Sequence, residues 1–414
     1  MSLRLSKSSS ELKKYLLSLY FLLLPVNLGP TIFGANLFFH RIVSFLFLLV
    51  YIVSLRKIRF KLHLFEVFVL GVLISLIPHS INGTADQKAV VFIFNILFAA
   101  CAAKYLIDEI VIGKAFQWLT TVSIVTDLTA LGIYSYVLAS GKAFIMQRSD
   151  YNIAYFSALR LSGFVGDPNF YVLIVLFLFP VNAYNFARER TPKNSLAVIL
   201  NLFTAFLTFS RSGWLAIAVE FLLIGIVGFR NRNWRSRRHM LIITVSFFLI
   251  LFFSPLGELA QERIATLEKD KNSDQHRFVL IERSFESFFS DECLLGLTKP
   301  ERIAIGVGVG NNYWFMEEFY GFAKVPHNTY IDFAIELGIF SLAFLLIPVQ
   351  MIYFVFKLRD KDLRILLLTI AVGTCLMLFF LSAAYYVPFF LLYFLLRGMH
   401  SRRNNMGECN PHPH

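Results

Sequence analysis

The stretch NTYIDFAIELGIFSLAFLLIPVQMIYFVF, residues 328–356, decides the fold class, because its only charged side chains are Asp332 and Glu336, both near its start. A membrane-spanning helix needs about 20 mostly apolar residues, and this stretch is longer than that. The whole chain has the same character: of 414 residues, 57% are hydrophobic and 16% charged, and the mean hydropathy is +0.63. Soluble domains are about 45–50% apolar and about 25% charged. The composition therefore excludes a soluble enzyme, a disordered chain and a disulfide-stapled secreted module, and it predicts an integral membrane protein.

Further apolar segments of similar character occur along the chain and predict about twelve transmembrane helices in an all-α fold. The first follows a polar, basic start and has no small-residue cleavage site behind it, so it is expected to be a retained span. The last two are separated only by Ala384 and could form one broken hairpin. The predicted spans are residues 15–29, 40–55, 63–81, 89–107, 114–138, 167–186, 194–210, 213–229, 239–254, 328–356, 364–383 and 385–396.

The distribution of basic residues predicts the orientation. With the N-terminus in the cytoplasm, most of the 39 Lys and Arg fall in short inner connectors, as the positive-inside rule requires. The net charge of +12 therefore indicates topology and not a nucleic-acid partner. The predicted organisation is helices one to nine in residues 1–254, an extracytoplasmic loop in 255–327, helices ten to twelve in 328–397 and a cytoplasmic tail in 398–414.

The long loop between helices nine and ten is the place where a structure outside the bilayer can form. Its acidic residues outnumber its basic ones, so any arginine that functions there does so by its position. Within it, residues 276–290 predict an amphipathic helix that lies on the membrane surface, because apolar side chains recur at helical spacing. These are Phe278, Ile281, Phe285 and Phe288.

Three short polar stretches interrupt the apolar pattern. The first, TFSRSGW at 208–214, joins two apolar segments almost without a loop and places Arg211 at the outer end of two packed helices. An arginine there is costly unless it snorkels to the interface, pairs or meets an anion. Both a snorkelling cap and an anion site remain open from the residue alone.

The second stretch, PHNTYID at 326–332, lies where the long loop re-enters the membrane. His327 could act as a general base, because the unperturbed imidazole pKa lies near neutral pH, or it could be a polar cap. Asp332 and Glu336 are four residues apart, on one helix face.

The third stretch, GFVGDPNF at 163–170, predicts a tight turn that starts a helix, with Asp167 as N-cap and Pro168 at the first helical position. Its alternative role is to shape the lip of an outward cavity.

Two other patterns have simpler explanations. The Asp360-Lys-Asp362 string is expected to be a solvated connector, and Gly306-Val-Gly-Val-Gly310 a flexible turn, since no strand precedes it as in a dinucleotide-binding loop.

Together, these stretches resemble the O-antigen ligase and polysaccharide polymerase family of bacterial membrane glycosyltransferases. The resemblance spans roughly residues 160–340 and rests on three ordered strings and an arginine-bearing segment at 277–287. The strings are T-x-S-R-x-G-W at 208–214, Gly306-Val-Gly-Val-Gly-Asn311, which is similar to the family's G-x-G-x-N stretch, and H-N-x-Y…E-x-G from His327 to Gly338.

The resemblance implies transfer of a glycan from undecaprenyl pyrophosphate to a second glycolipid at the outer face of the bacterial inner membrane. By resemblance, Arg211 and Arg277 engage the donor pyrophosphate and His327 lies near the acceptor hydroxyl, as the catalytic set. Arg283, Arg160, Asn328 and Tyr330 are expected to bind substrate. No cofactor or metal is expected, because an activated sugar already has a good leaving group. The other expected partners are membrane lipid and a chain-length regulator.

Three classes of function remain open at this point: a glycosyltransferase, which is a polymerase or a ligase, a transporter, and a structural or sensory protein. A polymerase is favoured, since the Gly-Asp-Pro-Asn stretch looks more like exopolysaccharide and capsule polymerases, and a ligase that transfers the glycan to lipid A core is the alternative. A multispan lipid-glycan or solute transporter would usually show related halves and charges near the membrane midplane. No repeat is visible, although Glu220 lies within the eighth span. A structural or sensory protein would leave the ordered strings unexplained.

Overall fold

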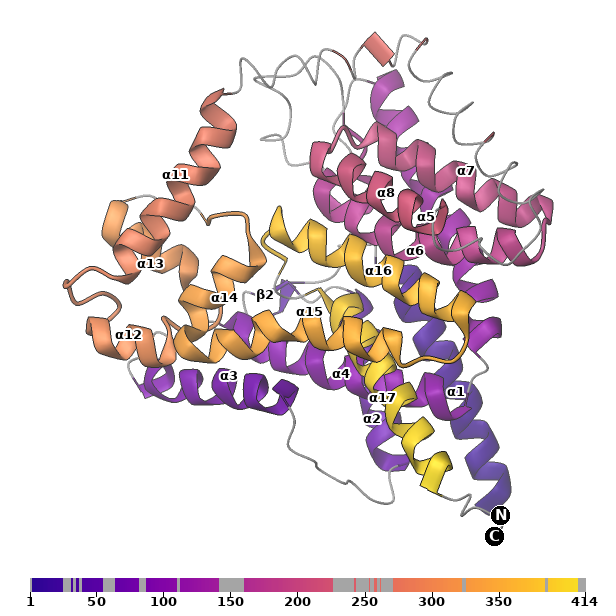
Figure 1. Cartoon of the computed structure of the whole chain (residues 1–414), viewed down its shortest axis with the longest axis horizontal. Helices are drawn as coiled ribbons and strands as arrows, with labels where there is room; N and C mark the ends of the chain where they lie inside the picture. The colour runs from indigo at the N-terminus through magenta and orange to yellow at the C-terminus, as the bar shows by residue number, and fades with distance from the viewer. Residues whose placement is uncertain are drawn as a thin grey trace. The chain divides into compact units, whose positions relative to one another are not determined.

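The computed structural model describes residues 2–24, 31–32, 35–36, 39–54, 64–81, 87–109, 112–140, 160–225, 242, 253, 257–258, 261, 271–321, 325–383 and 386–408. Within these ranges the chain is helical apart from turns and one antiparallel pair of two-residue strands, β1 (Thr31–Ile32) and β2 (Ala35–Asn36) (Figure 1). The all-helical prediction is thus confirmed for this part of the chain.

The helices have the following bounds. Before the long predicted loop they are α1 (Ser2–Leu23), α2 (Phe39–Ser54), α3 (Leu64–Ile81), α4 (Gln87–Glu109), α5 (Ile112–Ser140), η2 (Gly163–Val165), α6 (Pro168–Arg188), α7 (Pro192–Leu207) and α8 (Arg211–Leu223). After it starts they are α11 (Lys271–Phe288), α12 (Lys299–Ile305), α13 (Asn312–Tyr320), α14 (Thr329–Leu337), η4 (Gly338–Phe340), α15 (Ser341–Phe356), α16 (Lys361–Phe379) and α17 (Val387–Glu408).

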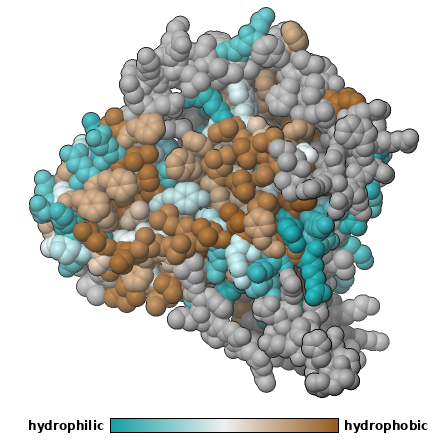
Figure 2. Space-filling model, viewed as in Figure 1, coloured by the Kyte–Doolittle hydropathy of each residue, from teal (hydrophilic) through white to brown (hydrophobic). Residues whose placement is uncertain are grey.

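Five helices in the described ranges are long and apolar enough to cross a membrane. They are Lys88–Ile107, Lys114–Ser140, Pro168–Arg188, Thr329–Phe356 and Lys361–Phe379, and Phe39–Val53 and Phe65–Ile77 are shorter apolar helices. The count of twelve stays a prediction, and the predicted span 239–254 lies almost entirely outside the described residues. Many side chains of α15 are apolar and exposed, as a lipid-facing surface requires, and Figure 2 shows brown side chains over much of this face.

The predicted tenth span is not one regular helix. A 3-10 turn, η4, separates α14 from α15, because Gly338 has φ +54° and its backbone lies against the carbonyl oxygens of Arg302 and Ile303. Only glycine combines this φ with that close approach. The last two predicted spans are separate helices, α16 and α17. Asp360 precedes α16 and caps it, since its carboxylate accepts the amide N–H groups of Asp362 and Leu363, which agrees with a solvated connector.

The chain divides into two compact units. The first comprises Met1–Arg56, Cys101–Leu267 and Leu358–Thr374, and the second Lys57–Ala100, Glu268–Lys357 and Cys375–His414.

The first unit is held together by polar contacts among α5, α6 and α7. The Asp127 carboxylate accepts hydrogen bonds from the Tyr171 hydroxyl (2.7 Å), the Asn201 amide (2.6 Å) and the Thr204 hydroxyl (3.0 Å), and it is fully buried. The Asn182 amide extends this network, donating to the side-chain oxygen of Asn201 at 2.6 Å. Apolar burial drives helix association only weakly inside a bilayer, so hydrogen bonds between helices are an effective way to fix their register.

The second unit has an aromatic core. The ring of Phe333 on α14 lies 5.5 Å from those of Phe68 (α3) and Phe92 (α4) and 4.3 Å from that of Phe344 (α15). A smaller cluster, in which Phe288, Leu294, Val307, Phe315 and Ile335 are buried, joins the loop helices to α14.

The Gly306–Asn311 loop is a turn, as expected, but it is packed and not flexible. The amide N–H groups of Val307 and Gly308 donate to the carbonyl oxygens of Ile335 (2.9 Å) and Glu336 (3.0 Å) at the end of α14. A Cβ on Gly306 would lie 2.2 Å from the Glu336 carbonyl oxygen. The glycines of this loop and of the E-x-G string thus allow two backbones to touch, which is an architectural role.

Arg302, on α12, is fully buried and fixes the start of this loop region. Its guanidinium donates to the carbonyl oxygens of Phe288 (3.2 Å), Glu292 (2.7 Å), Leu297 (2.8 Å) and Ser290 (2.5 Å). Burial lowers the pKa of this guanidinium, yet arginine remains charged at any physiological pH. The segment predicted as an acidic outer loop therefore contains a compact structure built around one buried cation.

Candidate active site

The connection between α7 and α8 is a strained hairpin that holds Arg211 at the first position of α8. Phe209 has φ +47°, which is uncommon for a bulky residue, and lets the chain reverse within three residues. Ser210 then caps α8, its hydroxyl accepting from the Gly213 amide N–H at 3.2 Å. The predicted tight connection is confirmed.

The other members of the T-x-S-R-x-G-W string support this hairpin. Gly213 lies so close to α6 that a Cβ there would be 2.7 Å from both γ carbons of Val172. The Trp214 indole stacks on Phe206 with centroids 5.3 Å apart, and its N–H donates to the Phe206 carbonyl oxygen at 3.3 Å. Ser210, Gly213 and Trp214 therefore each have a contact within the hairpin or with α6 that explains their place in the string.

Arg160 and Asn169 belong to the same scaffold. The Arg160 Nε donates to the Thr208 carbonyl oxygen at 2.9 Å, and its Nη2 lies 3.5 Å from Asn169 Oδ1. That oxygen also accepts a hydrogen bond from the Ser210 hydroxyl at 2.8 Å. The structure thus joins the predicted stretches 163–170 and 208–214 through the Asn169 side chain, which the sequence did not single out.

The electrostatic potential at the N-termini of α6 and α8 favours binding of an anion. The N-termini of α6 and α8 are tied together by Asn169 and Ser210, and a helix N-terminus carries a positive partial charge. The nearby acid, Asp167, caps its own helix by accepting the Asn169 amide N–H at 2.7 Å, as predicted. A cation at the first position of α8 does not stabilise the helix dipole. The position of Arg211 at the first residue of α8 is compatible with binding of a phosphate, which a guanidinium and a helix N-terminus both favour.

The second unit holds the other predicted site residues. His327 is exposed and has φ +54°, directly before the first turn of α14. Asn328 is buried as the N-cap of that helix, and its side-chain oxygen accepts from the amide N–H groups of Tyr330 (3.0 Å) and Ile331 (3.2 Å). The Tyr330 hydroxyl donates to the Cys375 carbonyl oxygen at 3.1 Å. These contacts of Asn328 and Tyr330 hold the start of α14, which follows His327 in the chain, and their predicted substrate roles stay predictions.

Arg277 and Arg283 lie on α11, which confirms a helix in the predicted amphipathic segment. The Arg277 side chain is outside the described part of the structure. The Arg283 guanidinium lies over the Tyr320 ring, 5.2 Å from its centroid, and the Tyr320 hydroxyl donates to Glu286 at 2.6 Å. Burial and the neighbouring Glu286 carboxylate raise the pKa of Tyr320 to about 12.

The predicted apolar face of α11 is only partly correct. Phe288 is buried, but Phe278 is 74% exposed and Phe285 37% exposed, while Leu280 and Ser284 face the protein. The exposed phenylalanines are compatible with the predicted contact between this helix and the membrane surface.

Sequence reasoning missed His79 at the end of α3. It is buried beneath the glycine loop of the same unit, where a Cβ on Gly308 would lie 2.4 Å from the imidazole Cδ2. Its Nδ1 is 3.5 Å from the Asn311 side-chain nitrogen. A histidine at the end of an apolar segment gives no signal of this contact, because the loop lies more than two hundred residues further along the chain. Asp127 was also missed, although a carboxylate inside an apolar span is itself a signal.

The candidate residues therefore form two groups: Arg160 and Arg211 in the first unit, and Arg277, Arg283, His327, Asn328 and Tyr330 in the second. A comparison with protein families bears on the segment that contains most of them. Residues 196–346 match the family model described as O-Antigen ligase. No match was found among curated proteins.

The O-antigen ligase domain confirms the predicted resemblance and supports assignment of the chain to the O-antigen ligase and polymerase family. It contains the hairpin of Arg211, α11, the glycine loop and α14. At family level it supports a membrane glycosyltransferase that acts on lipid-linked glycans. Together with the apolar helices, it indicates a multipass protein of the bacterial inner membrane.

Proposed function

We propose that the protein is a polysaccharide polymerase that transfers a glycan from undecaprenyl pyrophosphate to a lipid-linked acceptor sugar at the outer face of the inner membrane. The observation that carries this proposal is the placement of Arg211, within the O-antigen ligase domain, at a helix N-terminus that Asn169 ties to a second one. An arginine beside helix N-termini is well suited to bind a pyrophosphate.

In the proposed reaction, the acceptor hydroxyl oxygen attacks the anomeric carbon of the donor sugar and the bond from that carbon to the phosphate oxygen breaks. The hydroxyl proton passes to His327, and undecaprenyl pyrophosphate leaves with the bonding electron pair. Arg211 and Arg277 neutralise the charge that develops on the phosphate, since guanidinium groups bind phosphate oxygens bidentately. His327 is exposed, so an acceptor hydroxyl can reach it. A base in this position is worth roughly 10²–10⁴ in rate.

Arg160 and Arg283 have secondary roles in this proposal. Arg160 donates to the Thr208 carbonyl oxygen, so it steadies the hairpin of Arg211 while its charge adds to the local potential. Arg283 is held over Tyr320 and is the alternative to Arg277 on α11. Asn328 and Tyr330 contribute by fixing the start of α14, after His327.

Transfer to lipid A core, as by a ligase, is the alternative within the same chemistry, since both reactions need the same donor site. The Gly-Asp-Pro-Asn stretch favours a polymerase, and in the structure it forms the α6 side of the scaffold around Arg211.

A transporter would use intramembrane charges on its substrate path. Asp127 is such a charge, but its carboxylate is occupied by side chains of α6 and α7, which favours a structural role.

Deletion of the gene followed by gel analysis of surface glycans tests the proposal. A polymerase deletion leaves one repeat unit on the core, whereas a ligase deletion leaves polymer on the carrier lipid. Complementation with Arg211→Ala, Arg277→Ala or His327→Ala should fail to restore the ladder at normal membrane levels. Arg188→Ala is the matched control, because Arg188 is an exposed arginine at the other end of α6. Its guanidinium donates to the Tyr184 hydroxyl on the same helix. Full activity of all three variants would refute the proposal.

A further inference from the structure

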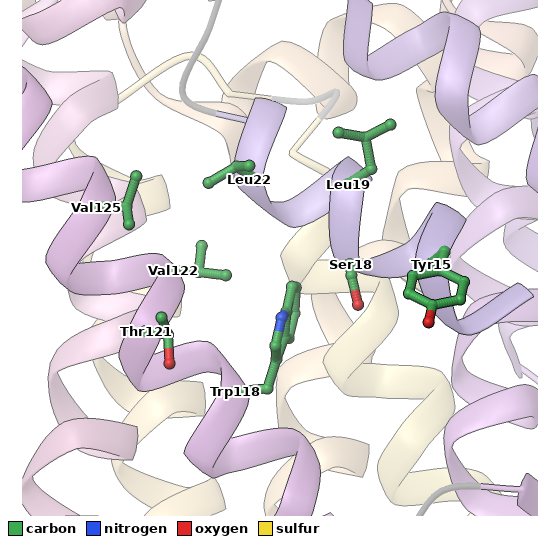
Figure 3. Close-up of a pocket in the computed structure, with 8 residues that line it drawn as sticks. All are labelled: Tyr15, Ser18, Leu19, Leu22, Trp118, Thr121, Val122 and Val125. Carbon is green, nitrogen blue, oxygen red and sulfur yellow. The ribbon is translucent and has the colours of Figure 1, made fainter. Parts of the chain in front are cut away.

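A groove with a volume of about 350 Å³ runs between α1 and α5, within the first unit. Figure 3 shows its two walls: Tyr15, Ser18, Leu19 and Leu22 project from one helix, and Trp118, Thr121, Val122 and Val125 from the other. The volume is at the lower end of the range for small-molecule sites. The groove therefore suits one slender chain and not a lipid-linked glycan.

One end of the groove is apolar. Leu22 and Val125 line it, and both stay partly exposed, at 37% and 43%. The Phe21 ring meets the lining residue Trp118 edge-on at 5.9 Å and stacks on Phe177 at 6.2 Å, so Trp118 is held by aromatic contacts. An acyl chain in this part would cover apolar side chains on two helices and would leave no polar group unsatisfied.

The opposite end is polar, aromatic and cationic. Tyr15 and Trp118 lie there, and such amphipathic rings are typical of the membrane–water interface. The Lys193 ammonium donates to the hydroxyl of Thr121, which lines the groove, at 2.7 Å. Lys114 is exposed one turn before Trp118 on the same face of α5.

The acidic residues at this end do not cancel its charge. Glu11 forms an ion pair with Lys14 at 3.7 Å, and Glu189 lies in a connector with Arg188 and Arg190 on either side. Asp108 and Glu109 also precede Lys114 in the sequence. With Glu11 and Glu189 they make four acidic residues, against seven basic residues in the same connectors, so this end is net positive. The basic residues are Lys13, Lys14, Lys104, Lys114, Arg188, Arg190 and Lys193.

We propose that the groove binds one acyl chain of an anionic glycerophospholipid, with the lipid phosphate held by Lys193 and Lys114. In the predicted topology both lysines are cytoplasmic, so the lipid belongs to the inner leaflet, where anionic headgroups attract basic side chains. This site is distinct from the residues assigned to glycan transfer and does not depend on that assignment.

Quenching of tryptophan fluorescence tests the proposal on the full chain in lipid nanodiscs. Phosphatidylglycerol with brominated acyl chains is titrated into phosphatidylcholine, and the signal of Trp118 is isolated by subtracting that of the Trp118→Phe variant. We expect saturable quenching that unbrominated phosphatidylglycerol reverses and brominated phosphatidylcholine does not produce. Lys193→Ala and Lys114→Ala should each weaken the apparent affinity about fivefold, which corresponds to ~1 kcal/mol per lysine near an anionic surface.

Two further variants keep the proposal falsifiable. Lys361→Ala is the matched control, since Lys361 is an exposed lysine at the start of α16 in the same unit and on the same predicted side, and it should leave the affinity unchanged. Val122→Phe should fill the groove and abolish the saturable component without adding a tryptophan. Equal quenching by the two brominated lipids, or unchanged affinity in Lys193→Ala, would overturn the proposal. So would a Val122→Phe variant that turns a dimer into a monomer without changing lipid affinity, since a second copy would then occupy the groove.

Discussion

Replacing Gly213 by alanine should move α8 away from α6 and disturb Arg211. The new Cβ would lie 2.7 Å from both γ carbons of Val172, which is buried. A valine on a helix has one strongly preferred rotamer, so its methyl groups cannot turn aside. Overpacking of this kind costs about 1–3 kcal/mol, offset by up to ~1 kcal/mol from the better helix propensity of alanine. We therefore expect a net loss of about 1–2 kcal/mol in the free energy of unfolding.

The effect on glycan transfer should be larger than the effect on folding. A displacement of 1 Å at a reacting group can cost about 10²-fold in rate, and α8 begins at Arg211. Thermal unfolding in detergent and transfer assays with membranes at matched protein level measure the two effects. Gly225→Ala is the control, because a Cβ there meets nothing within 4 Å.

A compensating change separates this explanation from general damage. Val172→Ala removes the two carbons that the new Cβ would meet, so the double variant should recover stability and transfer relative to Gly213→Ala alone, with a favourable coupling of at least ~1 kcal/mol. If Gly213→Ala retains full stability and transfer, or if Val172→Ala adds its own loss without any recovery, the packing of α8 on α6 does not position Arg211.

Three further perturbations have defined outcomes. Arg302→Met leaves four backbone carbonyl groups without their donor, at about 1–3 kcal/mol each, so proteolysis should cut the 288–302 segment. Lys299→Met, which removes a surface ion pair with Asp291 (3.1 Å), should have little effect. Hydrogen bonds from Thr298 lower the pKa of Glu301, so the cap stabilises α12 above the ordinary glutamate range and is lost as the pH falls through the lowered pKa. The protection factors of the α12 amides, which correct for the intrinsic exchange rate, should therefore fall there in wild type and not change over this pH range in Glu301→Gln. Asn169→Leu removes the acceptor that joins Ser210 to α6. It should reduce the rate of glycan transfer while leaving the unfolding temperature nearly unchanged, and a loss of transfer that only follows a lowered unfolding temperature would refute a positioning role.

Local signals predicted the parts of the fold that depend on neighbouring residues. Hydropathy located the helices, and the Asp167-Pro168 pair predicted the start of α6, because capping and proline geometry act within one turn. The break at Gly338 was not predicted, since it arises from contact with the Ile303 carbonyl oxygen on another helix.

The candidate site was predictable only as separate pieces. The residues of the Arg211 hairpin predicted a tight connection with a cation, but the link through Asn169 depends on how α6 packs on α8. The burial of His79 under the glycine loop and of Arg302 among four carbonyls likewise depends on contacts between distant segments. A single sequence contains the residues for these contacts but not their pairing.

The central proposal is that Arg211 and His327 both act on the glycan substrates from the extracytoplasmic side, and cysteine protection tests it most directly. Ser212→Cys and His327→Cys are introduced singly into a chain whose four native cysteines are replaced by serine, and a membrane-impermeant thiol reagent is added from the outer side. We predict that both cysteines react from that side and that polyprenyl-pyrophosphate-linked glycan protects both over the same concentration range. Reaction of either cysteine from the cytoplasmic side alone, or protection of one and not the other, would contradict the account.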